Sequence, residues 1–236
     1  MGFDRLKSGK GASKGRGKRN PSLVAIRRKK RNPDKFTGFD ISLSDQNIDP
    51  TTITDTGSQT FVVPRGVDTL TVEMVGAGGG GGSGNSGRGG AYTEGGGGGS
   101  GSKIVLVLEE VTPGTTLTFN VGAGGNYAGQ GGVGTHGVDG GDTTFTYGGV
   151  TYTSGGGDGG ESALGFGSAP DGSGGVATRS SGSEGTLTNG NDGAAKNTTG
   201  AGGSSVATTG SYGAGGNGQV SGTAQTAGTN GFVKIS

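Results

Sequence analysis

Cysteine and tryptophan are absent from this 236-residue chain, and His136 is its single histidine. Without cysteine the chain can form neither a disulfide nor a thiolate metal site, so the residues do not indicate a redox compartment. A lone histidine also argues against a catalytic triad and against a histidine-based metal cluster. We expect His136 to lie in a loop, with a receptor or interface contact as the alternative.

Long apolar runs are missing as well. Hydrophobic residues make up only 27% of the chain, and no stretch approaches the ~20 apolar residues that span a bilayer. The first residues lack the apolar core of a signal peptide. The sequence therefore predicts neither export through a signal peptide nor membrane insertion, and a conventional hydrophobic core can exist only locally.

Glycine dominates what is present, with 62 residues. Collagen is excluded because the glycines have no strict third-residue period and only 6 prolines accompany them. Most of the glycines fall in three tracts, at roughly 76–102, 122–142 and 154–231. The first tract separates two apolar runs, so it is either a flexible linker or an ordered structure between two strands.

Short runs rich in Val, Thr, Phe and Tyr flank these tracts and are bounded by Gly or Pro. They are QTFVVP, DTLTVEMV, KIVLVLE, TTLTFNV, TTFTY, VTYT and the terminal GFVKIS. In the second run, Leu70, Val72 and Met74 alternate with polar residues. Such alternation predicts strands with one buried and one polar face, as in an antiparallel sandwich. No segment has a helical period over ten residues, so we expect almost no α-helix.

The glycine tracts themselves are too long for ordinary loops, because structureless loops beyond about 15 residues are uncommon in compact domains. Glycine segments with three residues per turn can instead approach one another closely and hydrogen-bond through their backbones. The sequence therefore predicts an all-β fold: a small antiparallel β-sandwich scaffold with an inserted polyglycine II-like glycine-rich bundle, preceded by an extended basic N-terminal arm. Adaptable glycine loops are the alternative.

The net charge of +1 conceals two oppositely charged parts. Residues 1–35 hold 13 Lys/Arg against two Asp, a net charge of +11, whereas residues 36–236 hold 6 against 16 acidic residues, a net charge of −10. We divide the chain into a basic extended arm at 1–35, a connector at 36–57 and a glycine-rich β domain at 58–236.

The arm and the connector carry the candidate residues for docking to a partner. No aromatic residue lies between Phe3 and Phe36, so base stacking is not expected and any nucleic-acid contact would be with phosphates. Apolar residues among the cations can fill pockets of a partner, which favours an acidic protein surface over nucleic acid; a solvated tail is the third alternative. The candidates are Lys14, Arg16, Lys18, Arg19, Leu23, Val24, Ile26, Arg27, Arg28, Lys29, Lys30, Arg31, Phe36 and Phe39.

No catalytic or cofactor motif is complete. GAGGGG satisfies a dinucleotide-type G-x-G-x-x-G, as any glycine tract does, but no crossover helix follows. In GSGSK the lysine follows serine and precedes a strand, unlike a phosphate loop. The acidic pairs Asp139/Asp142 and Asp158/Glu161 lack the repeated calcium nonapeptide, and we interpret them as solvated turn carboxylates. We expect no enzyme activity, no metal and no other cofactor.

Three stretches carry a family resemblance. They read GSQTFVVPRGVDTLTVEMVGAGGGGG, PGTTLTFNVGAGG and GTNGFVKIS. Through them, the chain from about residue 57 to residue 236 resembles the glycine-rich domain that recurs in bacteriophage virion proteins, including tail-fibre tip adhesins and other appendages. The resemblance implies a β scaffold carrying a bundle of glycine helices, with no known chemistry. It does not extend to residues 1–56.

A structural virion protein of a bacteriophage, located on the particle surface, is the function that this resemblance implies. We expect the arm to bind other capsid or tail proteins, the chain to be a homo-oligomer on the particle, and the domain to be displayed as a head decoration, fibre or tail appendage. A receptor-binding adhesin of a tail fibre is the first alternative, and a coat protein with a genome-binding arm is the second. The candidate receptor contacts are Tyr92, Tyr127, Phe166 and Tyr212.

Overall fold

The computed structural model describes most of the chain after the arm. The described residues are 48–86, 92–129, 135–163, 172, 175–179, 185–194, 200–219 and 224–236. The chain divides into two units, residues 1–46 and 47–236, and all described residues belong to the second. The basic arm and the connector up to residue 47 lie outside the described residues, so the docking residues assigned there stay predictions.

Twelve strands make up the described fold. They are β1 Thr51–Ile53, β2 Gly57–Val62, β3 Leu70–Val75, β4 Asn85–Ser86, β5 Tyr92–Thr93, β6 Lys103–Leu108, β7 Thr116–Val121, β8 Thr143–Tyr147, β9 Val150–Ser154, β10 Ala177–Arg179, β11 Thr186–Thr188 and β12 Phe232–Ile235. One five-stranded sheet has the order β1-β12-β3-β6-β11, a second has the order β10-β9-β8-β7-β2, and β4-β5 form a two-stranded sheet. All pairings are antiparallel.

The described residues contain no helix, which confirms the all-β prediction. No helix in this part of the chain is long and apolar enough to cross a membrane.

The hydrophobic core lies between the inner faces of the two five-stranded sheets. On β3, Leu70, Val72 and Met74 are fully buried, as their alternation predicted. On the facing sheet, the rings of Phe119 and Phe145 stack with their centroids 4.5 Å apart. A stacked aromatic pair adds about 0.5–1.5 kcal/mol beyond the area that it buries, so this contact helps to hold β7 against β8.

The sandwich begins earlier than the sequence suggested. β1 pairs along its three residues with β12, and Ile48 and Ile53 pack against the core. Residues 48–57, assigned to the connector, therefore contribute to the domain. β10 and β11 were also missed, and they lie within the third glycine tract as edge strands paired with β9 and β6. All three strands have only three residues, too few to produce an alternating pattern.

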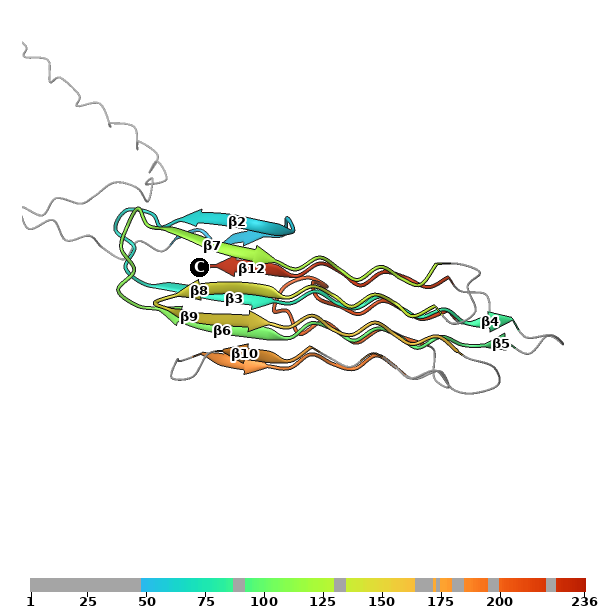
Figure 1. Cartoon of the computed structure of the whole chain (residues 1–236). Coiled ribbons are helices and arrows are strands. Elements are labelled where there is room, and N and C mark those ends of the chain that lie inside the picture. Colours follow the sequence, from blue (N-terminus) through green and yellow to red (C-terminus); the bar gives the residue numbers. More distant parts are fainter. Residues whose placement is uncertain are drawn as a thin grey trace, which may run out of the picture. The chain divides into compact units, whose positions relative to one another are not determined.

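The glycine tracts leave the sandwich along the direction of its strands and run side by side to the far end of the domain (Figure 1). The β4-β5 sheet lies at that far end. Residues 76–83 directly continue β3, and residues 94–102 lead directly into β6. The strands thus set the starting positions of the glycine segments.

Candidate functional site: the glycine bundle

One glycine segment, residues 76–83, lies at the centre of the bundle and is buried along its whole length. Its N–H groups point in turn to three neighbours, so residues three apart donate to the same neighbour. Gly76, Gly79 and Gly82 donate to segment 94–102, Ala77, Gly80 and Ser83 to segment 135–141, and Gly78 and Gly81 to segment 224–231. This repeat of three residues per turn is the geometry of a polyproline II-type helix.

The carbonyl groups of the same segment bind three further neighbours. Gly157, Gly160 and Ala163 donate to them from segment 155–163, Gly125 and Ala128 from segment 122–128, and Gly216 and Gln219 from segment 213–219. Segment 76–83 therefore has six neighbours, three that accept from it and three that donate to it. All N–H groups of 76–83 and the C=O groups of 77–83 are therefore paired with backbone of other segments, as burial requires.

Segment 94–102 is a second centre, and it also has six neighbours. Around the two centres, the other segments form a closed ring in which each is hydrogen-bonded to the next. In order, the ring consists of 122–128, 135–141, 155–163, Gly172 with 175–176, 190–194, 200–203, 213–219 and 224–231, which bonds back to the first. The ring segments follow one another in the order of the sequence. Both central segments precede them in the sequence, and the rest of the chain then passes once around the two centres.

Glycine is required in the centres because the backbones approach so closely. A Cβ placed on Gly78, Gly79 or Gly81 would lie 1.9, 2.1 or 1.8 Å from a carbonyl oxygen of a neighbouring segment. No carbon atom fits at that distance, since favourable nonbonded contacts begin near 3.5 Å. The adaptable-loop alternative is therefore wrong for the described residues, and the prediction of an ordered polyglycine II-like bundle is confirmed.

The sequence does mark the two centres, although sequence reasoning missed the signal. Each centre contains an unbroken run of five glycines, 78–82 and 95–99. The peripheral segments contain no run of more than three glycines, and some of their other residues, such as Asn126 and Tyr127, are exposed. Five glycines in a row thus indicate a segment with neighbours on all sides.

Side chains complete the hydrogen bonding on the outside of the ring. His136 Nδ1 accepts from Ser162 N–H at 3.4 Å, Asp139 Oδ1 from Gly159 N–H at 2.8 Å, and Asp142 Oδ1 from Gly156 N–H at 2.9 Å. Acceptors and donors are both spaced by three residues because both segments repeat every three residues. His136 therefore belongs to a ladder between two bundle segments and not to a loop. Asp139 and Asp142 are exposed, as expected of solvated carboxylates, but they take part in this ladder, whereas the exposed Asp158 and Glu161 do not.

A comparison with known families agrees with this architecture. The sequence profile described as a glycine-rich domain matches residues 53–234, which include the bundle and nearly all of the two five-stranded sheets. The chain belongs to the glycine-rich domain family. No curated protein matches the chain. The resemblance is thus confirmed for the glycine-rich domain, while a bacteriophage virion as its source stays a prediction.

The candidate receptor contacts of the glycine-rich domain lie in different surroundings. Phe166 and the side chain of Tyr92 are outside the described residues. The side chain of Tyr127 is 46% exposed. The ring of Tyr212 instead packs on buried Phe232, with the centroids 4.9 Å apart. Tyr212 therefore packs at the junction of bundle and sandwich.

The segment before Tyr212 also covers the outer face of the β1-β12-β3-β6-β11 sheet. Thr208 donates its N–H to Glu73 Oε1 at 2.9 Å and its hydroxyl to Glu73 Oε2. These bonds explain how the Glu73 carboxylate, on β3, is accommodated at only 7% exposure. A buried carboxylate with such partners has a structural role and needs no substrate to explain it.

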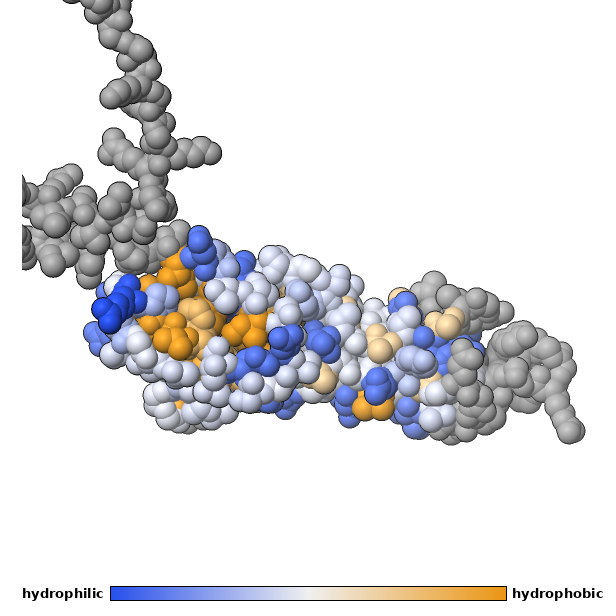
Figure 2. Space-filling model, turned by 90° about the horizontal axis from the view of Figure 1, so that it is seen from above, coloured by the Kyte–Doolittle hydropathy of each residue, from blue (hydrophilic) through white to orange (hydrophobic). Residues whose placement is uncertain are grey.

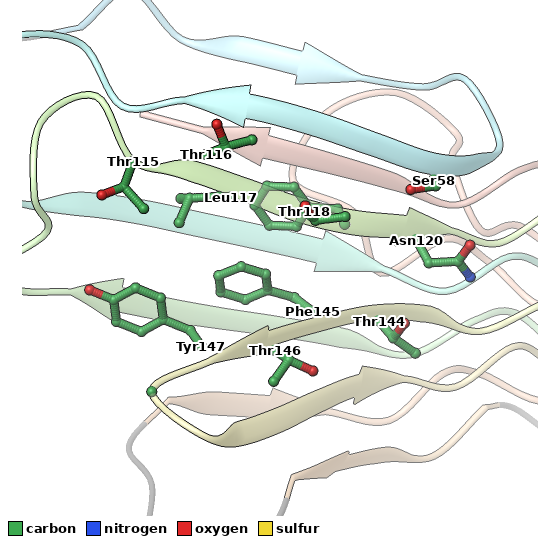
Figure 3. A pocket seen from close by; sticks show the side chains of 12 residues that line it. Ser58, Thr115, Thr116, Leu117, Thr118, Asn120, Thr144, Phe145, Thr146 and Tyr147 are labelled. Atoms are coloured by element: carbon green, nitrogen blue, oxygen red, sulfur yellow. The ribbon is translucent and has the colours of Figure 1, made fainter.

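A shallow depression between β7 and β8 is lined by hydroxyl-bearing side chains, including Thr116, Thr118, Thr144 and Thr146 (Figure 3). Its lining contains no charged residue and no histidine, so it offers no group for acid–base chemistry at neutral pH. No group of three His, Asp or Glu side chains in the described part of the chain is placed to hold a metal ion.

At the junction of sandwich and bundle, the fully buried Thr143 on β8 joins two backbone groups. Its hydroxyl donates to Val75 C=O at 2.7 Å and accepts from Gly122 N–H at 3.1 Å. Thr143→Val keeps the side-chain shape but leaves both groups without this partner, so we expect a loss of about 2–4 kcal/mol in the free energy of unfolding. Denaturant unfolding measures it. Thr144→Val on the polar face is the control, and an equal loss in both variants would contradict the prediction.

The carboxyl group of Asp158 is expected to destabilise the domain at neutral pH. Burial, followed by the charges of Asp139 and Asp192, raises its pKa. The folded state then holds this proton more tightly than the unfolded state, so its contribution to stability increases as the pH falls. Asp158→Asn should raise the melting temperature slightly at pH 7, within ~0.5 kcal/mol because the residue is exposed. The difference should vanish below about pH 3.9, and a lower melting temperature at pH 7 would contradict it.

Proposed function

We propose that this chain is a structural virion protein of a bacteriophage. In this proposal the basic arm anchors the chain to capsid or tail subunits, and the glycine-rich domain is displayed on the particle surface as a head decoration, fibre or tail appendage. The protein acts as a homo-oligomer on the particle and catalyses no reaction. The closed hydrogen-bonded bundle is the observation that carries the proposal.

The bundle supports a mechanical role because its interior has no room for chemistry. Segments 76–83 and 94–102 are enclosed by backbone on all sides, and a substrate or cofactor cannot enter where a single Cβ does not fit. Ten segments that lie side by side and are bonded to one another form a stiff rod that extends the sandwich. Such a rod separates an anchored end from a displayed end, which is what a particle appendage needs.

The division of charge supports anchoring by the arm. Residues 1–35 have a net charge of +11, against −10 for residues 36–236. Charges of opposite sign on the arm and on the rest of the chain favour contacts between subunits when many copies assemble. The domain also resembles those of bacteriophage virion proteins, which supports a virus particle as the assembly to which the arm binds.

A receptor-binding adhesin is the second candidate, and the exposure of Tyr127 favours it. Tyr127 lies near the end of segment 122–128 that points away from the sandwich. Exposed tyrosines at the tip of a rod can contact a host surface. A coat protein with a genome-binding arm is a lesser alternative, which would require the arm to run along nucleic acid.

The position of the chain in whole particles tests the proposal. A density map of the particle, together with a copy-number measurement by mass spectrometry, should find the glycine-rich domain outside the shell or on the tail. Its absence from purified particles would overturn the proposal. Density for the domain only at a fibre tip, together with loss of host adsorption in Tyr127→Ala, would favour the adhesin.

A further inference from the structure

The four edge strands of the sandwich are not alike. Three of them, β1, β10 and β11, have three residues each. Short edge strands protect a sheet against pairing with another chain. The fourth edge strand, β2, has six residues, and none of them is charged or proline. β2 therefore lacks the protection that the other edges have.

β2 directs one row of backbone groups to its open side. Val63 N–H donates to Thr115 C=O at 2.9 Å, and Val63 C=O accepts from Gly114 N–H at 2.8 Å. Because the hydrogen-bonding direction alternates along a strand, the odd-numbered residues of β2 face β7. The N–H and C=O groups of its even-numbered residues point away from β7, and no described strand pairs with that side.

The inner face of β2 is also incompletely covered. Leu117 and Phe119 on β7 are buried, whereas Phe61 and Gln59, which lie directly opposite them, are only half-buried. On the opposite, outer face of β2, Val62 at the end of the strand is 58% exposed. Figure 2 looks onto this side of the domain and shows hydrophobic residues gathered at the sandwich end. An additional strand beside β2 would cover Phe61 and extend the core.

We propose that residues 39–43 of a second copy of this chain bind the free edge of β2 as an added strand. The segment reads FDISL, so its apolar residues alternate with Asp40 and Ser42. This pattern matches β2, which has half-buried Phe61 on one face and exposed Thr60 on the other. Backbone bonds would supply the affinity of such an added strand, and the alternating side chains its register.

The place where the described chain begins supports this occupant. Ile48 is the first described residue, and β1, three residues later, itself pairs with an edge of the other sheet. Only residues 54–56 separate β1 from β2, so the proposed occupant precedes the strand with the open edge by a short stretch of chain. The choice of a second copy rests on the proposed fastening role of the arm, because a segment exchanged between copies links them.

Disulfide trapping tests the contact directly, since the chain has no cysteine of its own. Full-length Ser42→Cys and Thr60→Cys proteins are mixed and oxidised, because both positions lie on the polar face of the proposed pair. We expect a mixed disulfide dimer at least ~10-fold above the control, owing to the high effective concentration of paired segments. In the control, Thr118→Cys replaces Thr60→Cys; Thr118 is paired with Thr60 on the inner neighbour β7.

Each other outcome overturns the proposal. A dimer of Thr60→Cys with itself as the main product would show that β2 pairs with β2 of a second copy. In a further protein that carries both Ser42→Cys and Thr60→Cys, an intramolecular disulfide without dimer formation would place the segment on its own domain. A yield of mixed disulfide dimer no greater than that of the control would show that residues 39–43 do not bind the edge of β2.

A proline at position 60 provides an independent test by sedimentation of the full-length chain. Thr60→Pro removes an N–H that points to the open side and leaves the bonds to β7 in place, so the fold should persist. We expect an unchanged circular dichroism spectrum and a shift from oligomer to monomer; a parent chain that is monomeric at high concentration contradicts the proposal. Neither test uses particles, so their outcome is separate from that of the virion proposal.

Discussion

Gly79→Ala is expected to destabilise the glycine-rich domain by more than about 3 kcal/mol, the upper end of the range for overpacking. The added Cβ would lie 2.1 Å from the carbonyl oxygen of Asp158. Backbone on every side of segment 76–83 leaves no flexible side chain that could move aside. For a domain of this size, such a loss lowers the melting temperature by about 6–12 °C, which thermal unfolding followed by circular dichroism measures. Gly79→Val should be worse.

The chain offers two matched glycines for this experiment. At Gly156, in the ring, a Cβ would lie 2.0 Å from Gly140 C=O, so Gly156→Ala should also be disruptive. At Gly129 a Cβ meets nothing within 4 Å, and Gly129→Ala should change stability by less than ~1 kcal/mol. Melting curves that are the same for all three variants would show that the glycines do not act as packing residues.

Removal of residues 1–35 should abolish incorporation into particles while the glycine-rich domain stays folded. The truncation removes a net charge of +11 and the apolar residues Leu23, Val24 and Ile26. An extended arm of this length spans about 100 Å, so its weak contacts can spread over several subunits and add up through avidity. We expect at least a ~10-fold drop in copies per particle, which corresponds to ~1.4 kcal/mol, measured by quantitative mass spectrometry.

Two milder variants separate apolar anchoring from charge. Replacing Leu23, Val24 and Ile26 by serine should reduce incorporation more than replacing the cations of 27–31 by glutamine, because a segment that orders on docking depends on its buried anchors. Moderate salt should weaken assembly only in part, since it screens exposed charge pairs and leaves apolar contacts unaffected. Normal copy number of the truncated protein would contradict docking by the arm. Binding of the arm along nucleic acid would favour the coat-protein alternative.

Much of the sandwich could be predicted because alternation is a local property. Leu70, Val72 and Met74 are buried together on β3, as their spacing required. The same reasoning failed at the edges, where β1, β10 and β11 are too short to alternate. It also misjudged His136, because the partner that gives this side chain its role, Ser162, lies on another segment of the bundle.

The sequence by itself determined that the domain is all-β and that its glycine tracts pack as backbone, because strand periodicity and missing side chains need no knowledge of neighbours. The tertiary structure alone decided which segments pair with each other, how the ring closes and which edge stays open. Gly78, for example, donates to the carbonyl group of Thr229, which is far from it in the sequence. A helix with three residues per turn presents equivalent bonding groups in several directions, so its partners are set by the surrounding segments and not by its own residues.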